Sequence, residues 1–175
     1  MSTGPRYRVH FRRRREGKTD YRVRLRLLRS GRSRAVVRCS DTRVRVSIVS
    51  FDPAGDRVLA VADSSELGGI DFPAGRIGST PAAYLTGLLA GLRAKSVGTQ
   101  EAVLDVGLRR PTKGGRLAAA LKGLLDAGID IPHGEEGFPS QERLNGAHLP
   151  TPLPQPVEAY KLKLSGIVAR AEAKK

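Results

Sequence analysis

The segment AVVRCSDTRVRVSIVSFDPAGDRVLAVA, residues 35–62, decides the fold because it contains three consecutive β-type runs. These runs are Ala35–Cys39, Val44–Phe51 and Arg57–Ala62. In the second run Val44, Val46 and Ile48 alternate with polar residues, which is typical of a strand with one face exposed to water. Turn-forming residues separate the runs, at 40–42 and at 53–56. The pattern predicts an antiparallel three-stranded meander.

A loop rich in Gly, Ser and Asp is expected over residues 63–79, and a helix is expected to follow it. Thr80 is the predicted cap and Pro81 the first helical residue. One face of the helix carries four leucines, which are Leu85, Leu88, Leu89 and Leu92. A stripe of small residues spaced by four, made by Ala83, Gly87 and Gly91, is expected to let this helix lie close against the sheet.

Two further core elements complete the domain. Ala102–Gly107 is short and apolar, as a buried strand should be, and Gly115–Ala127 has the leucine periodicity of a helix that stops at Gly128. The order is therefore βββαβα. We predict an α/β (α+β) fold in which helices pack on a mixed sheet, formed by the three-stranded antiparallel meander and one further strand.

Both ends of the chain are expected to be appendages to one domain spanning residues 19–149. Residues 1–18 lack apolar periodicity, so we expect an extended basic arm. After the arm, Thr19 could cap a helix that Gly31 ends, although the alternation V-R-L-R-L also fits a strand. Residues 150–175 comprise a Pro-rich linker and a C-terminal helix, which either docks on the domain or awaits a partner.

The positive charge is concentrated at one end of the chain. Residues 1–45 hold 16 of the 31 Lys and Arg residues and only three acids, so the remainder is nearly neutral. Such asymmetry predicts nucleic acid or an anionic surface as the partner. The four consecutive arginines Arg12–Arg15 repel one another unless phosphates lie between them. Tyr7, Phe11 and Tyr21 add possible stacking faces for bases.

The basic end of the chain has two other interpretations. A lone basic run is often a solvated tail or a localisation signal, but here the charge continues into a segment that contains apolar residues. A basic amphipathic helix can also lie on a membrane. Val23, Leu25 and Leu27 alternate with arginines, so they leave no wide apolar face and are better explained as holding the segment against the domain.

A second cationic segment, RRPTKGGR at residues 109–116, joins the predicted last strand to the predicted last core helix. A helix start offers free backbone N–H groups that attract anions. Four cations and two glycines, which allow close approach, strengthen this attraction. We therefore predict phosphate contact here, rather than a connection that happens to be basic.

Catalytic and metal-binding signals are weak. Gly17-Lys18-Thr19 resembles the end of a phosphate-binding P-loop, but Arg12 stands where that motif requires glycine. The alternative function is a metal-dependent nuclease with a ribonuclease H scaffold, using carboxylates from Asp52, Asp63, Asp105 and Asp126. These acids lie near turns and helix ends, which favours structural roles, so no enzyme activity is expected.

The remaining composition points to a reducing, cytoplasmic setting. The single cysteine, Cys39, lies in an apolar run and is expected to be a small core residue. His10, His133 and His148 are scattered without metal-ligand spacing, so neither metal nor cofactor is expected. No apolar run approaches the roughly 20 residues of a membrane span.

Three segments resemble a known family. They are FRRRREGKTDYRVRLRLL (11–28), AAYLTGLLAGLRA (82–94) and LDVGLRRPTKGGRLAAALKGLLDAGIDIPH (104–133). Together they are similar to the archaeal and eukaryotic branch of the 5S-rRNA-binding ribosomal proteins, universal large-subunit protein eighteen. The resemblance covers about Arg6 to Leu149, whereas PTPLPQP and the residues after it match no feature of the family.

The resemblance implies a structural protein of the large ribosomal subunit that binds 5S rRNA and helps attach it to the large rRNA at the central protuberance. The implied partners are 5S rRNA, large-subunit rRNA and neighbouring ribosomal proteins, with no membrane and no small-molecule substrate. It also implies RNA contacts by the basic N-terminal segment, by the turn after the first strand and by the loop before the last core helix. The predicted RNA-binding residues are Arg6, Tyr7, Arg8, Phe11, Arg12, Arg13, Arg14, Arg15, Lys18, Tyr21, Arg22, Arg24, Arg26, Arg29, Ser40, Thr42, Arg43, Arg109, Arg110, Thr112, Lys113 and Arg116.

Overall fold

The computed structural model describes residues 4–134, 137–150 and 153–172, with side chains as far as residue 167. Its sheet has four strands, which are β1 (Ser33–Cys39), β2 (Val44–Ser50), β3 (Arg57–Asp63) and β4 (Ala102–Asp105). Their order is β3-β2-β1-β4; β1, β2 and β3 are antiparallel neighbours, and β4 runs parallel to β1. The predicted meander and the mixed sheet are confirmed.

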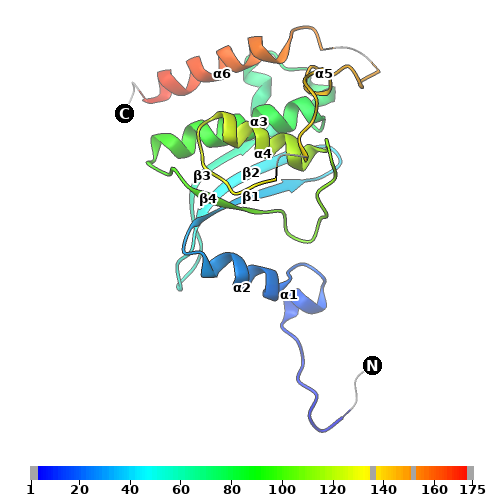
Figure 1. Ribbon diagram of the computed structural model, residues 1–175, viewed down its shortest axis with the longest axis vertical. Helices are drawn as coiled ribbons and strands as arrows, with labels where there is room; N and C mark the ends of the chain where they lie inside the picture. The colour runs from blue at the N-terminus through cyan, green and yellow to red at the C-terminus, as the bar shows by residue number, and fades with distance from the viewer. Residues whose placement is uncertain (1–3, 135–136, 151–152, 173–175) are drawn as a thin grey trace.

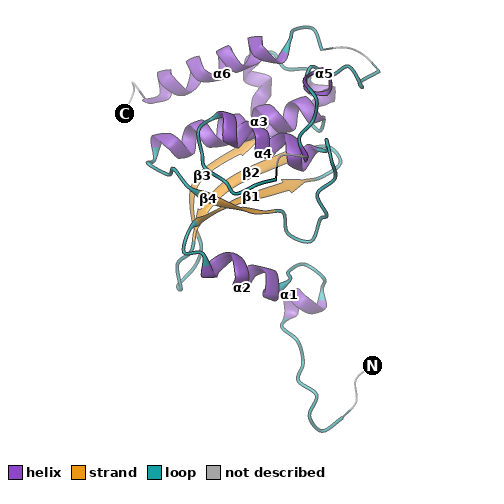
Figure 2. Ribbon diagram, in the orientation of Figure 1, coloured by secondary structure: helices purple, strands orange, loops and turns teal. Residues whose placement is uncertain are grey.

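Helices cover one face of this sheet and leave the other open (Figures 1 and 2). The covering layer contains α3 (Thr80–Ser96) and α4 (Arg116–Asp126), and α6 (Val157–Glu172) lies beyond α3. On the opposite side lie α1 (Arg12–Arg15) and α2 (Tyr21–Arg29). The N-terminal segment is thus separated from the main helical layer by the sheet.

The alternation of residues along the strands explains the two faces. Ala35 and Val37 in β1 pair with Ile48 and Val46 in β2, and all four are fully buried under the helices. Arg38, which alternates with them, pairs with Arg45 on the open face. Burial of the apolar set supplies the main driving force for folding, at roughly 25 cal/mol per Å² of apolar area.

The small-residue stripe of α3 packs against α4, and the prediction that it approaches the sheet is wrong. A methyl group at Gly87 would overlap the backbone carbonyl oxygen of Ala120, and one at Gly91 would meet the side chain of Ala127. The contact is reciprocal, because a methyl group at Gly123 in α4 would overlap the carbonyl oxygen of Tyr84. The two helices therefore touch backbone to backbone.

Gly87→Ala should destabilise the protein by about 1–3 kcal/mol, because overpacking of this contact outweighs the gain in helix propensity. Gly166→Ala is the matched control, since Gly166 lies in α6 with open space around the position of the added methyl. The control should stabilise by roughly 0.5–1 kcal/mol. Urea denaturation of the two variants measures both effects, and equal stabilities would contradict the close helix contact.

Several local predictions are corrected. The N-cap of α2 is Asp20 rather than Thr19, because the Asp20 carboxylate accepts hydrogen bonds from the backbone N–H groups of Arg22 and Val23. The arm contains one helical turn at Arg12–Arg15 instead of being extended throughout. Two 3-10 helices, Ser64–Ile70 and Ala74–Arg76, occupy part of the predicted loop. The short helix α5 (Gln141–Leu144) was not predicted.

The C-terminal helix docks on the domain, which decides between the two predicted alternatives. Val157, Tyr160 and Leu164 are buried in the common hydrophobic core. The ring of Tyr160 meets that of Phe72 edge to face, with 5.3 Å between the ring centroids. Ile167, three residues beyond Leu164, is 42 % exposed. Residues 173–175 of the predicted C-terminal segment lie outside the described residues.

Candidate nucleic-acid interface

The predicted basic arm is fully accessible. Every described residue from Gly4 to Lys18 is exposed, and α2 contains no buried residue. Within the arm, Glu16 accepts ion pairs from Arg12 at 3.7 Å and from Lys18 at 2.8 Å. The Nε of Arg13 donates to the hydroxyl of Thr19. One acid therefore offsets only part of the charge of this segment.

Aromatic rings accompany these cations. Phe11 is 73 % exposed, and its ring centroid lies 5.3 Å from that of Tyr21 at the start of α2. Tyr7 is also exposed, and its ring meets His10 edge to face. Exposed aromatic rings among cations can stack on unpaired bases. The sequence prediction of possible stacking faces is therefore compatible with the geometry.

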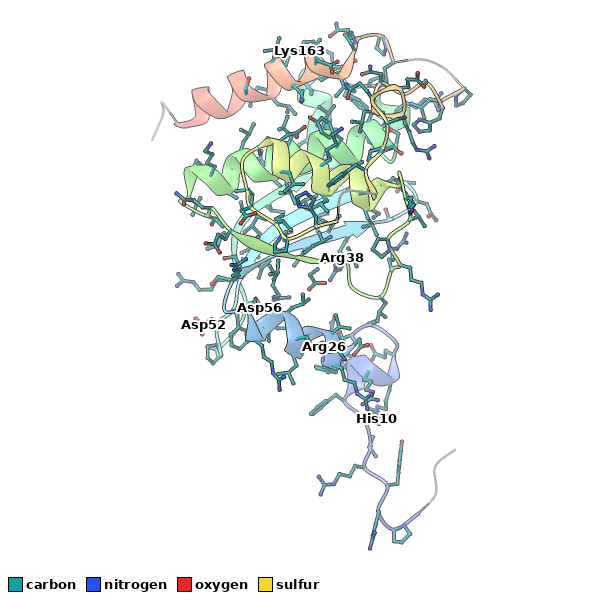
Figure 3. All side chains as sticks on the ribbon, viewed as in Figure 1. His10, Arg26, Arg38, Asp52, Asp56 and Lys163 are labelled. Atoms are coloured by element: carbon teal, nitrogen blue, oxygen red, sulfur yellow. The ribbon has the colours of Figure 1, made fainter. Side chains whose placement is uncertain are left out.

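The arginines of α2 divide into two groups. Arg22, Arg26 and Arg29 are spaced by four and three residues, so they share one helix face, and all three are exposed. Arg24 lies on the opposite side and contacts the domain, where its Nη2 donates to both carboxylate oxygens of Asp56, at 2.9 and 3.1 Å. Figure 3 shows Arg26 on α2, with Asp56 on the adjacent hairpin.

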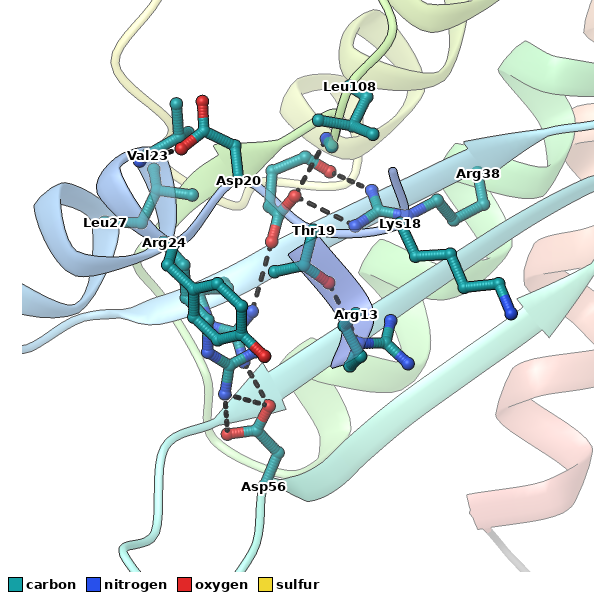
Figure 4. Close-up of a pocket in the computed structure, with 14 residues that line it drawn as sticks. Arg13, Lys18, Thr19, Asp20, Val23, Arg24, Leu27, Arg38, Asp56 and Leu108 are labelled. Carbon is teal, nitrogen blue, oxygen red and sulfur yellow. Dashed lines mark hydrogen bonds and ion pairs between the residues drawn. The ribbon is translucent and has the colours of Figure 1, made fainter. Parts of the chain in front are cut away.

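Asp56 belongs to a longer series of ion pairs on the open face of the sheet (Figure 4). Asp56 accepts a third bond, from Arg34 in β1, and Arg34 also donates to Asp105 in β4 at 3.1 Å. Asp105 in turn accepts from Arg38 and from the backbone N–H of Gly107. Burial alone would raise the pKa of Asp56, but the hydrogen bonds and charges of Arg24 and Arg34 outweigh it and lower the pKa.

A cavity of about 530 Å³ separates the N-terminal segment from the sheet. Figure 4 shows side chains from both sides converging on it. Its cations are Arg13, Lys18, Arg24, Arg34 and Arg38, and its acids are Asp20, Asp56 and Asp105. Positive charge exceeds negative charge in the lining, and Val23, Leu27 and Leu108 provide apolar wall.

The structure brings together the two other predicted RNA-binding segments. Arg116 at the start of α4 donates from Nη1 to the backbone carbonyl oxygens of Ser40, at 2.6 Å, and of Gly78, at 3.1 Å. The turn itself is closed by bonds between Ser40 and Arg43. Arg116 thus fixes the Ser40–Arg43 turn beside the loop at residues 109–116. The other predicted residues of the two segments are exposed, namely Thr42, Arg43, Arg109, Arg110, Thr112 and Lys113.

Two cations on the open face of the sheet were not among the predicted site residues. Arg38 and Arg45 pair across β1 and β2, and their side chains are 48 % and 63 % exposed. The alternation of β1 held the signal, because Arg34 and Arg38 must lie on the face opposite Ala35 and Val37. The basic surface therefore extends from α2 across part of the sheet.

The four acids of the nuclease alternative have structural partners. Asp105 is buried between Arg34 and Arg38, and Asp126 accepts a hydrogen bond of 2.6 Å from the hydroxyl of Tyr84. Asp63 pairs with Arg45, and Asp52 accepts from the backbone N–H of Ala54 in its own turn. Within the described part of the chain, no three His, Cys, Asp or Glu side chains are placed to hold a metal ion. No described helix has the length and apolar content needed to cross a bilayer.

Comparison with known proteins identifies the family. The sequence matches the family model for the ribosomal large subunit proteins 60S L5 and 50S L18 over residues 5–100 and 92–134. The chain belongs to this family. The large ribosomal subunit protein uL18 of Haloarcula marismortui is 52 % identical over 149 residues, which are 85 % of this chain and 79 % of the relative. The uL18 of Methanoculleus marisnigri is also 52 % identical over 149 residues, 85 % of each chain.

Membership in the L5/L18 family confirms the resemblance drawn from the three sequence segments. It places the chain among the structural proteins of the large ribosomal subunit. The matched residues include the basic arm from residue 5, α2, the open face of the sheet and the loop before α4. The cationic surface therefore lies entirely within the part shared with the family.

Proposed function

We propose that this protein binds 5S rRNA and helps attach it to the large rRNA at the central protuberance. The observation that carries the proposal is the separation of charge and core in the fold. The arm and α2 present exposed arginines on the open side of the sheet, whereas the core-forming helices lie on the other side (Figure 1). Arginine suits this role because its planar fork binds phosphate oxygens in pairs and stacks on bases.

Two surfaces would contact the RNA. The arm and the outward arginines of α2 form the larger one, and the loop at residues 107–116 with the Ser40–Arg43 turn forms the second. Backbone N–H groups at the start of α4 add a favourable dipole for phosphate, since its N-cap, Gly115, offers no side chain to occupy them. Neighbouring ribosomal proteins are expected to complete the site.

A structural role also accounts for the acids. Asp105 is neutralised by two guanidinium groups and held by the backbone of Gly107, so its carboxylate supports the loop that follows β4. A two-metal nuclease needs carboxylates that converge on a shared ion. We therefore infer a binding protein, and no catalytic step is proposed.

The proposal predicts that affinity for 5S rRNA falls steeply with salt. If about six to eight phosphates are contacted, the logarithm of the association constant should fall against the logarithm of salt concentration with a slope of roughly −4 to −7. Filter-binding titrations from low to moderate salt measure this slope. A length-matched RNA of unrelated sequence is the control, and it should bind more weakly at every salt concentration. A slope near zero, or equal affinity for the control RNA, would contradict the proposal.

A further inference from the structure

The orientation of α2 depends on polar contacts more than on packing. The helix buries no residue, and its apolar residues Val23 and Leu25 are 40 % and 54 % exposed. The sequence prediction that these residues hold the helix against the domain is therefore wrong for both. The helix is instead joined to the domain by the ion pair between Arg24 and Asp56. Leu27 and Leu28 are only half-buried, so apolar packing alone fixes the direction of the helix weakly.

Asp56 is well suited to hold α2 because its own carboxylate is fixed by a second part of the domain. It directly precedes β3, and its Oδ2 also binds Arg34. The Arg34 side chain is only 4 % exposed and is fixed on its other side by Asp105. The carboxylate that receives Arg24 is thus tied to the centre of the sheet rather than to a free loop.

The spacing of the arginines gives this contact a directional effect. Because Arg24 lies on the helix side opposite Arg22, Arg26 and Arg29, anchoring Arg24 to the domain turns the other three outward. Asp56 is also an acid within a cationic surface, where long-range electrostatics alone would oppose RNA binding. Its presence there is explained if the orientation that it imposes contributes more than its charge costs.

We propose that Asp56 is a positioning residue for RNA binding, which holds α2 through Arg24 so that Arg22, Arg26 and Arg29 face one RNA partner. This inference rests on the RNA-binding function proposed above. Asp56 itself is not expected to contact RNA. It acts by fixing the helix before binding, so that less conformational freedom is lost in the complex.

The test compares Asp56→Asn with Asp52→Asn in the full-length protein, using 5S rRNA as the probe. Both variants remove one negative charge from the same hairpin, but within the described part of the chain the Asp52 carboxylate bonds only to the backbone N–H of Ala54 in its own turn. Simple electrostatics predicts that both variants bind more tightly. The positioning role predicts that Asp56→Asn binds roughly tenfold more weakly, whereas Asp52→Asn binds as tightly as the parent or more tightly.

A second comparison separates positioning from general loss of structure. Arg24→Gln should weaken binding to a similar extent, and the double variant Arg24→Gln, Asp56→Asn should be no weaker than either single variant, because both changes break the same contact. Loss of overall stability would give additive effects. Additive losses, or an Asp56→Asn variant that binds like Asp52→Asn, would overturn the inference. Failure of the parent protein to bind 5S rRNA would instead refute the proposed function.

Discussion

Deletion of residues 1–18 is expected to remove most of the affinity for 5S rRNA while leaving a folded domain. The deletion removes seven Lys and Arg residues and only one acid. Their loss should make the salt slope shallower by roughly four to six units, because phosphates that are no longer contacted release no counterions on binding. Filter binding measures the affinity, and thermal denaturation followed by circular dichroism measures the fold.

The domain should survive this deletion because the described arm contributes nothing to the core. Residues 4–18 are all exposed, and the buried core begins at Ala35. The matched charge control is Lys163→Gln, since Lys163 lies on α6 at the opposite end of the molecule from the arm (Figure 3). That variant should bind 5S rRNA like the parent. A truncated protein that retains full affinity would show that the domain, and not the arm, dominates binding.

The largest expected effect on stability comes from Asp105→Ala. This change leaves Arg34, whose side chain is 4 % exposed, without its partner in β4, and it also removes acceptors for Arg38 and Gly107. Breaking a buried ion pair by removing one partner costs about 3–5 kcal/mol. Arg34 keeps its bond to Asp56, but its Nε already has no hydrogen-bond partner among the described residues, so the loss of Asp105 is only partly compensated. Urea denaturation should show the loss as a lower midpoint.

Glu101→Ala is the matched control for this prediction. Glu101 pairs with Arg32 at 2.9 Å, just before the starts of β4 and β1, but the two side chains are 54 % and 42 % exposed. An exposed pair contributes roughly 0–1 kcal/mol, because water and salt screen it. Equal destabilisation by the two variants would show that burial of the Arg34–Asp105 pair has no special role.

The regular elements could be predicted from sequence because their signals are local. The alternation at Val44, Val46 and Ile48 fixed β2, and the turn-forming residues between the runs fixed the hairpins. Asp20 and Thr19 both fit a helix cap, and only the bonds from Asp20 to the following N–H groups decide between them. Boundaries at this scale depend on single side-chain contacts that periodicity does not contain.

Contacts between distant segments were harder to predict. The stripe at Gly87 and Gly91 was recognised, but a small-residue stripe fits a sheet or a helix equally well. The matching small residues Ala120 and Gly123 in α4, and Ala127 at its C-cap, held the missing signal. Arg34 and Asp105 lie 71 residues apart, and their pairing follows only from the parallel register of β1 and β4. The predicted role of Arg24 in RNA contact likewise took no account of its partner on the hairpin.

Amide hydrogen exchange of the full-length protein, with and without 5S rRNA, tests whether RNA binds on the open side of the sheet. We expect RNA to slow exchange in the arm, in α2 and in the loop at residues 107–116. The buried amides of α3 should change little, because that helix lies behind the sheet. Without RNA, the arm should exchange quickly, because its exposed arginines repel one another in the absence of phosphates. An arm already protected in the free protein, or RNA protection confined to the α3 and α6 side, would contradict the account.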